Sequence, residues 1–218
     1  MDRANGIRGA CRVPAVPVTL RDVDLVEEIV VLDGRDLSVL RPRDSEALLD
    51  EHAFERDEFM PYWAELWPSG VALARAVATR SLKGARVVEL GCGLGLPSIA
   101  AALAGGRVLA TDWAVDSVAA TAANAVRNGA QVETLRVDWR EPEPLLERAP
   151  FDLVLAADVL YEERNVDPLL ALLPRLAPEA WIADPGRATA ARFWAAAEAG
   201  WSVAAKPPVY RLRRLTAA

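Results

Sequence analysis

Short apolar runs alternate with helix-like stretches over most of the chain from residue 85 onward. Strands are predicted at 85–88, 107–111, 132–137, 151–157 and 180–183, and helices at 70–79, 97–103, from 115, 166–176 and 189–199. The run at 151–157 is almost continuously apolar, which is typical of a strand buried on both faces. Strands that alternate with helices in this way predict a parallel sheet with helices on both faces.

The last two predicted strands follow a different pattern. They lie at 201–205 and 209–215, and the three residues between them are too few for a parallel crossover but adequate for a hairpin. The final strand should therefore run antiparallel. Before residue 61 the pattern is mixed and allows strands at 16–20 and 28–32. We expect residues 1–60 to form an N-terminal extension of uncertain structure packed on one domain, 61–218.

Composition narrows the class of protein. The 218 residues are 52% hydrophobic and 26% charged, which predicts one soluble globular core. A net charge of −6 argues against broad affinity for nucleic acids. Cys11 and Cys92 form neither a disulfide framework nor a metal set, and the single histidine, His52, excludes a histidine-rich metal site. The lack of a disulfide framework fits a reducing cytoplasm as the predicted location, and no signal peptide or membrane span is expected.

A glycine-rich turn joins the strand at 85–88 to the helix at 97–103. Its candidate ligand-binding residues are Glu89, Gly91, Cys92, Gly93 and Gly95. Glycines let the backbone approach a ligand, and the helix that follows presents unpaired N–H groups. A dinucleotide fingerprint would need glycine at position 96, where this chain has leucine. The turn therefore favours a nucleotide-like ligand other than NAD.

An acid follows the next strand. Asp112 lies 112 − 89 = 23 residues after Glu89, close to the roughly 20 expected of an acid that binds ribose hydroxyls. The neighbouring Trp113 offers a flat face to adenine. The alternative is that Asp112 is a solvated cap of the helix that begins at 115.

The glycine turn and the acid before it resemble the first motif of the class I S-adenosylmethionine (AdoMet) methyltransferases. Segments 61–70 and 157–162, together with Asp138-Trp139, narrow the resemblance to the protein lysine methyltransferases of methyltransferase family 16, which include the enzyme acting on the electron-transfer flavoprotein β-subunit. The resemblance implies a Rossmann-like three-layer α/β sandwich with a seven-stranded, mostly parallel sheet and an antiparallel last strand. Its implied cofactor is AdoMet, with S-adenosylhomocysteine as product.

The same resemblance assigns roles to further residues. It puts Trp67 against the cofactor, Gly91 to Gly93 around the amino-acid portion, Asp138 and Trp139 near adenine, and a main-chain contact at Ala157. An aromatic face also attracts a sulfonium on physical grounds. The alternative is that Trp63 and Trp67, four residues apart, form an apolar face of a helix.

Asp158 and Tyr161 are the candidate catalytic residues. Methyl transfer is an in-line displacement that depends on positioning. At neutral pH only roughly one lysine amine in a thousand is unprotonated. A carboxylate favours the ammonium form, so Asp158 is expected to anchor and orient the amine, while Tyr161 walls the channel or hydrogen-bonds the amine. The alternatives are a helix-capping Asp and a core Tyr.

The predicted function is methylation of a protein lysine, with a small-molecule methyltransferase as the alternative on the same fold. A nicotinamide-dependent oxidoreductase and a non-catalytic AdoMet-binding scaffold are the other classes. The run 158–161 lacks the Pro-Pro of nucleic-acid and glutamine amino methyltransferases, so no nucleic-acid partner is expected. Segment 184–187 either shapes a substrate pocket or forms a turn. The sequence leaves the methyl acceptor and the oligomeric state open.

Overall fold

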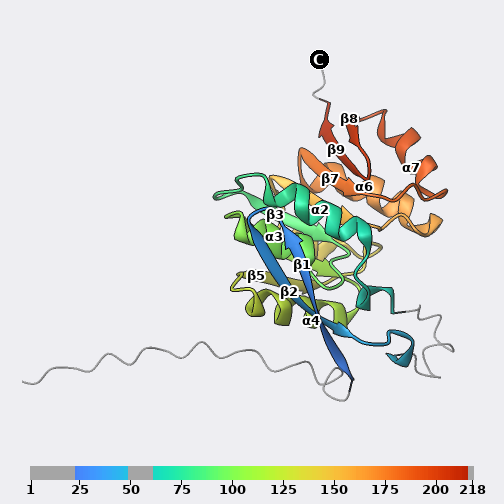
Figure 1. Ribbon diagram of the computed structural model, residues 1–218. Coiled ribbons are helices and arrows are strands. Elements are labelled where there is room, and N and C mark those ends of the chain that lie inside the picture. The colour runs from blue at the N-terminus through green and yellow to red at the C-terminus, as the bar shows by residue number, and fades with distance from the viewer. Residues whose placement is uncertain (1–22, 49–60, 216–218) are drawn as a thin grey trace, which may run out of the picture.

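The structure is a computed structural model that describes residues 23–48 and 61–215 (Figure 1). The predicted strand at 16–20, Cys11 and His52 lie outside these residues. The elements are β1 Leu25–Leu32, β2 Arg35–Pro42, η2 Glu46–Leu48, η3 Tyr62–Ala64, α2 Pro68–Ala78, β3 Arg86–Leu90, α3 Leu96–Leu103, β4 Arg107–Asp112, α4 Val115–Arg127, β5 Val132–Arg136, α5 Glu143–Leu146, β6 Leu153–Ala157, η4 Glu163–Asn165, α6 Val166–Leu176, β7 Glu179–Ala183, α7 Ala190–Ala197, β8 Trp201–Lys206 and β9 Val209–Arg214.

Seven strands form the main sheet in the order β5-β4-β3-β6-β7-β9-β8. The first five are parallel, β9 lies antiparallel beside β7, and β8 pairs antiparallel with β9. The predicted parallel sheet with an antiparallel last strand is therefore confirmed. The sequence prediction had no element between 137 and 151, where the short helix α5 lies.

Successive side chains of the central strands point to opposite faces of the sheet, and helices cover the apolar side chains on each face. On β6, Leu153 and Leu155 pack with α2, α3 and α4, whereas Val154 packs with α6 and α7. The fully buried Trp181 lies in the first of these cores and Phe193 in the second. The result is the predicted three-layer sandwich. Within the described residues, no helix is long and apolar enough to cross a bilayer.

A separate hairpin, β1–β2, packs on the α4 side of the sandwich (Figure 1). Only residues 28–32 of it were predicted, and β2 was missed. Asp33-Gly34 between the strands is a recognised hairpin signal, and Gly34 has a φ of +75°, which favours glycine. Leu37 and Val39 of β2 are fully buried in the core.

Polar side chains on α4 and at its C-cap attach this hairpin to the domain. Asn124 and Asn128 each bond both the N–H and the carbonyl of one β2 residue, Leu40 and Ser38 respectively, at 2.7–3.1 Å. The same Asn124 amide donates to the carbonyl of Leu94 at 3.1 Å. One buried side chain therefore connects the hairpin to the glycine turn.

Glu89 joins β3 to α3 and is 1% exposed. Its Oε2 accepts hydrogen bonds from the Ser98 N–H at 2.9 Å and the Ser98 hydroxyl at 2.5 Å. Burial raises the pKa of Glu89 from 4.5 to about 8, because removal from water penalises the carboxylate more than the Ser98 bonds favour it. The folded protein therefore holds this carboxyl protonated at pH 7.

This raised pKa predicts a stability that falls as pH rises. Between pH 4.5 and about 8 the unfolded chain loses the Glu89 proton while the folded chain keeps it, so the unfolding free energy decreases by about 1.4 kcal/mol per pH unit for this group alone. In Glu89→Gln this contribution should be absent. Urea unfolding at pH 5, 6.5 and 8 measures it, with exposed Glu133→Gln as control. Equal slopes in wild type and Glu89→Gln would contradict the prediction.

Candidate functional site

A cavity of about 470 Å³ opens at the carboxyl ends of β3, β4 and β6. This is where the strand order reverses, the usual ligand position in an open α/β sheet, and the volume is in the range of small-molecule sites. Most of the predicted site residues line it: Trp67, Gly91, Gly93, Asp112, Trp113, Asp138, Trp139, Ala157, Asp158 and Tyr161. The fold thus brings together residues that are far apart in the sequence.

Three predicted residues lie outside this cavity. Glu89 and Cys92 line a smaller cavity of about 40 Å³ beside it, and Gly95 lines neither. The Cys92 thiol faces α4, with Ser117 Oγ at 3.7 Å and Thr121 Oγ1 at 3.3 Å, and burial raises its pKa well above the usual value. Gly95, at φ +84°, precedes α3, and a Cβ there would lie 2.6 Å from Thr121 Cγ2. These residues shape the turn.

The glycine turn forms one wall of the larger cavity. Gly91 has φ of +70°, and an added Cβ would lie 3.0 Å from Val159 Cγ1 and 3.7 Å from the Trp139 ring. At Gly93, with φ of +53°, a Cβ would approach the Trp63 carbonyl oxygen to 3.3 Å. Both glycines are required by their backbone conformation and by the space left at the wall.

Asp112 ends β4 and is 6% exposed. Its Oδ2 accepts the Gly93 N–H and its Oδ1 accepts the Ala114 N–H, both at 3.0 Å. Burial raises the pKa of Asp112, and these backbone donors oppose the shift. The alternative of a solvated helix cap does not fit, because the side chain is buried at the cavity wall. The Asp112 carboxylate lies at the wall of the cavity, where it can accept hydrogen bonds from the hydroxyls of a ligand.

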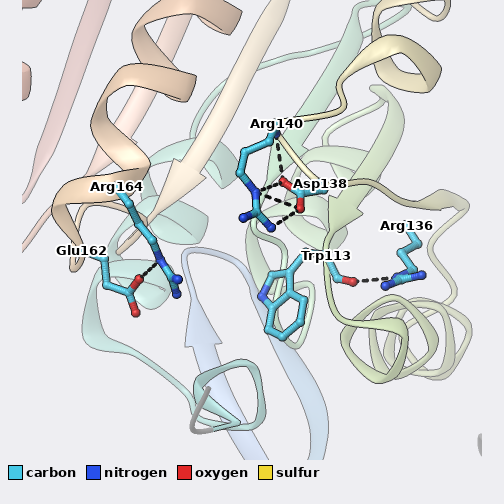
Figure 2. A network of polar contacts seen from close by, with 6 residues as sticks. All are labelled: Trp113, Arg136, Asp138, Arg140, Glu162 and Arg164. Atoms are coloured by element: carbon cyan, nitrogen blue, oxygen red, sulfur yellow. Dashed lines mark hydrogen bonds and ion pairs between the residues drawn. The ribbon is translucent and has the colours of Figure 1, made fainter. Parts of the chain in front are cut away.

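Two ion pairs flank Trp113 at the mouth of the cavity (Figure 2). Arg140 bonds Asp138 at 2.5 Å and lowers its pKa, and Arg164 bonds Glu162. Both arginines line the cavity, and the sequence analysis missed them. The acidic partner of each arginine stands two residues before it in the chain. This short spacing is the sequence signal by which each ion pair could have been predicted.

The Trp67 ring lies at the N-terminal end of α2, whereas Trp63 belongs to the separate turn η3. The two tryptophans therefore do not form one helix face, and both line the cavity. Trp67 Nε1 donates to the Tyr62 carbonyl at 2.8 Å. The Tyr62 ring lies between Trp67 and Tyr161, with centroid distances of 6.1 and 5.4 Å, and was not predicted as a site residue.

Asp158 follows β6 directly, at a φ of +55° that is rare for a residue other than glycine. Its N–H donates to the Ala183 carbonyl at 2.8 Å, which extends the sheet pairing by one residue. Within the described part of the chain its carboxylate is bonded by Arg187 alone, with Arg187 Nε donating to Oδ1 at 2.7 Å. Asp158 is therefore not a helix cap. Asp158 lines the cavity, with a side chain that is 5% exposed.

Tyr161 lines the cavity and is not a core residue. Burial raises the pKa of Tyr161 to about 12, so the phenol keeps its proton at neutral pH and can donate a hydrogen bond.

Arg187 is a site residue that sequence reasoning missed. The segment 184–187 is a turn, as one of its two interpretations stated, because Asp184 Oδ1 accepts the N–H groups of Gly186 at 2.7 Å and Arg187 at 2.9 Å. The turn also carries the Arg187 side chain to Asp158 and to within 5.8 Å of the Trp67 ring centroid. In the ranges 23–48 and 61–215, no cluster of His, Cys, Asp or Glu could hold a metal ion.

Comparison with solved structures supports the fold. The chain superposes on the 16S rRNA N2 G1207 methyltransferase RsmC of T. thermophilus, solved with AdoMet and guanosine, with a TM-score of 0.64 at 15% identity, covering 88% of this chain and 51% of that one. A magnesium protoporphyrin IX methyltransferase from Synechocystis gives a TM-score of 0.54 at 20% identity, covering 77% of this chain and 98% of that one. At these identities the likeness concerns the fold alone.

Relatives are found in sequence as well. The chain is 35% identical over 137 residues to the electron transfer flavoprotein beta subunit lysine methyltransferase of Xenopus laevis. The aligned region covers 59% of this chain and 54% of that protein. It is 32% identical over 155 residues to the histone-arginine methyltransferase METTL23 of the same organism, covering 66% and 62%. The chain thus spans little more than half the length of these relatives. The model of the lysine methyltransferase family matches residues 54–181, more than half of the chain. This chain belongs to the lysine methyltransferase family.

Proposed function

We propose that the protein transfers a methyl group from AdoMet to the side-chain amine of a lysine in another protein. One observation carries the proposal: a single cavity joins the glycine turn and Asp112 to Asp158 and Tyr161. The glycine turn and Asp112 suit a nucleoside with an amino-acid tail. Asp158 and Tyr161 suit an incoming amine. The family and its relatives that methylate protein lysines support the same acceptor class.

The residues present suit AdoMet. Gly91 and Gly93 leave a cradle that a Cβ would fill, and Asp112 presents a carboxylate at the cavity wall to a ribose diol. Trp67, Trp113 and Trp139 supply aromatic faces for the adenine and the sulfonium. When bound, AdoMet supplies a methyl group on a positively charged sulfur.

Residues of this chain position the acceptor amine. Asp158 anchors the amine, and the protonated Tyr161 walls the channel against Tyr62 and excludes water from the approach. Because the displacement is in line, holding the amine against the methyl group can supply much of the rate. We further propose that the protein acts in the cytoplasm and that its partner is a protein rather than a nucleic acid, in keeping with its net charge of −6.

The first prediction concerns the cofactor. AdoMet and S-adenosylhomocysteine should raise the melting temperature, whereas NAD should not. A ligand that binds only the folded state stabilises it by about 2.7 kcal/mol at 100 times its dissociation constant, enough for a clear thermal shift. A shift with NAD and none with AdoMet would instead indicate an oxidoreductase.

A second prediction concerns Asp112→Asn, which keeps the shape of the side chain but removes its charge. Hydrogen bonds to charged groups contribute about 1.5–3 kcal/mol, so the affinity for S-adenosylhomocysteine should fall roughly tenfold or more. Calorimetric titration measures it, with Asp36→Asn on the exposed side of β2 as the matched control. Unchanged affinity would leave Asp112 with a purely structural role.

A third prediction separates acceptor from cofactor. Asp158→Asn should slow methyl transfer about a hundredfold or more and leave the affinity for S-adenosylhomocysteine nearly unchanged, because orientation of the acceptor is lost. Labelled AdoMet and a cell lysate, separated into protein and small-molecule fractions, give the rate. Acid hydrolysis of the protein then distinguishes methyl-lysine from methyl-arginine. The control is Asp167→Asn, which breaks an exposed ion pair with Arg192. Label confined to small molecules would refute a protein acceptor.

A further inference from the structure

Arg187 and Asp158 form an ion pair at the edge of the cavity that the proposed function leaves unexplained. Asp158 contributes a side chain that is 5% exposed and Arg187 one that is 35% exposed. Asp158 lines the cavity, whereas Arg187 is not among its lining residues. The guanidinium carbon of Arg187 lies 5.8 Å from the centroid of the Trp67 ring, which lines the same cavity.

Other contacts hold each partner of this ion pair in place. Asp158 is fixed by the sheet pairing of its N–H with Ala183, and Arg187 by the turn in which Asp184 Oδ1 accepts its N–H. Asp184 is 1% exposed, and its Oδ2 has no hydrogen-bond partner in the described structure. The hydrogen bond and charge of Asp158, together with the charge of Asp184, raise the pKa of Arg187, so it stays a cation. Arg187 is thus the cation that two buried carboxylates share.

Only one oxygen of Asp158 is taken by Arg187. The bond uses Oδ1, so Oδ2 remains as acceptor for a group in the cavity. An amine bonded to Oδ2 would lie about 3 Å from that oxygen and roughly 6 Å from the guanidinium carbon, so the repulsion is about half of the attraction. An isolated carboxylate would raise the pKa of the amine and hold it as ammonium, which cannot attack a methyl group. Arg187 reduces that effect.

We propose that Arg187 is a positioning residue for the acceptor, and that its charge offsets about half of the attraction of the Asp158 carboxylate, so that Asp158 can hold a lysine amine in its unprotonated form. This inference rests on the proposed function and deepens it. It explains how a carboxylate can orient the acceptor with a smaller rise in the free-energy cost of removing the acceptor's proton than an isolated carboxylate would cause.

Other charges face the same space and have compensating partners. On the β5 side Asp138 is paired with Arg140, and after β6 Glu162 is paired with Arg164. Asp112, at the end of β4, is bonded by backbone N–H groups, and the raised pKa of Tyr161 keeps its phenol uncharged at neutral pH. Removal of Arg187 would therefore expose the acceptor to the uncompensated charges of Asp158 and Asp184.

The test measures the charge preference of the acceptor position directly. The probe is an S-adenosylhomocysteine analogue in which nitrogen replaces the sulfur and carries a 3-aminopropyl arm, and its reference is the analogue with a propyl arm. The ratio of their dissociation constants at pH 7.5 isolates the contribution of the terminal amine. We compare wild type, Arg187→Gln, Arg187→Lys and Asp158→Asn. Arg192→Gln, which removes an exposed arginine from an Asp–Arg pair, is the matched control.

We expect Arg187→Gln to shift the ratio about tenfold toward the charged arm, which corresponds to one unit in the pKa of the bound amine. Arg187→Lys and Arg192→Gln should keep the wild-type ratio. Asp158→Asn, which retains Arg187, should shift the ratio the opposite way because the guanidinium is then unopposed. This last variant tests the proposal independently if Arg187→Gln does not fold.

Turnover with labelled AdoMet and lysate protein provides a second readout. In Arg187→Gln the curve of rate against pH should move to higher pH by about one unit, whereas a purely structural role would lower the rate equally at every pH. An unchanged ratio in Arg187→Gln, or the same shift in Arg187→Lys, would overturn the role of the charge. If wild type binds neither the analogues nor S-adenosylhomocysteine, the proposed function itself fails, and that outcome is distinct from the others.

Discussion

The polar face of α4 holds the glycine turn, and the shape of the cavity depends on it. Ser117 and Thr121 both donate to the Gly93 carbonyl at 3.0 Å, and Asn124 donates to the Leu94 carbonyl at 3.1 Å. These carbonyls have no strand or helix partner of their own, and leaving them unpaired inside the protein would cost about 1–3 kcal/mol each. Because the turn is fixed from behind, Gly91 and Gly93 remain at the wall of the cavity.

The buried acids around this turn are stabilised in three different ways. Glu89 keeps its proton at neutral pH, Asp112 accepts backbone N–H groups, and Asp158 is paired with a guanidinium. A buried carboxylate is tolerated only if it is neutralised or hydrogen-bonded. The first solution suits a joint between β3 and α3, and the second leaves acceptor positions free for a ligand. The third provides an anchor whose charge is offset, as a site for an amine requires.

The hairpin β1–β2 belongs to the same network, although it precedes the sheet in the chain. Asn124 bonds β2 on one side and the glycine turn on the other. The residues of α4 and its C-cap that make these contacts stand at 117, 121, 124 and 128, the three- and four-residue spacing of a helix face. That polar stripe in an alanine-rich helix was visible in the sequence, but it could be interpreted only once its partners were known.

The sequence by itself determined the alternation of strands and helices, the antiparallel last strand and the glycine turn, because these depend on local periodicity and on the backbone freedom of glycine. It also indicated Asp112, Asp158 and Tyr161, which lie at strand ends. Only the tertiary structure decided that Cys92 and Gly95 face α4 and that Trp63 and Trp67 occupy separate elements. The pairing of Asp158 with Arg187 joins residues 29 positions apart on neighbouring strand ends. Local patterns carry no information about such contacts, because sheet order and burial set them.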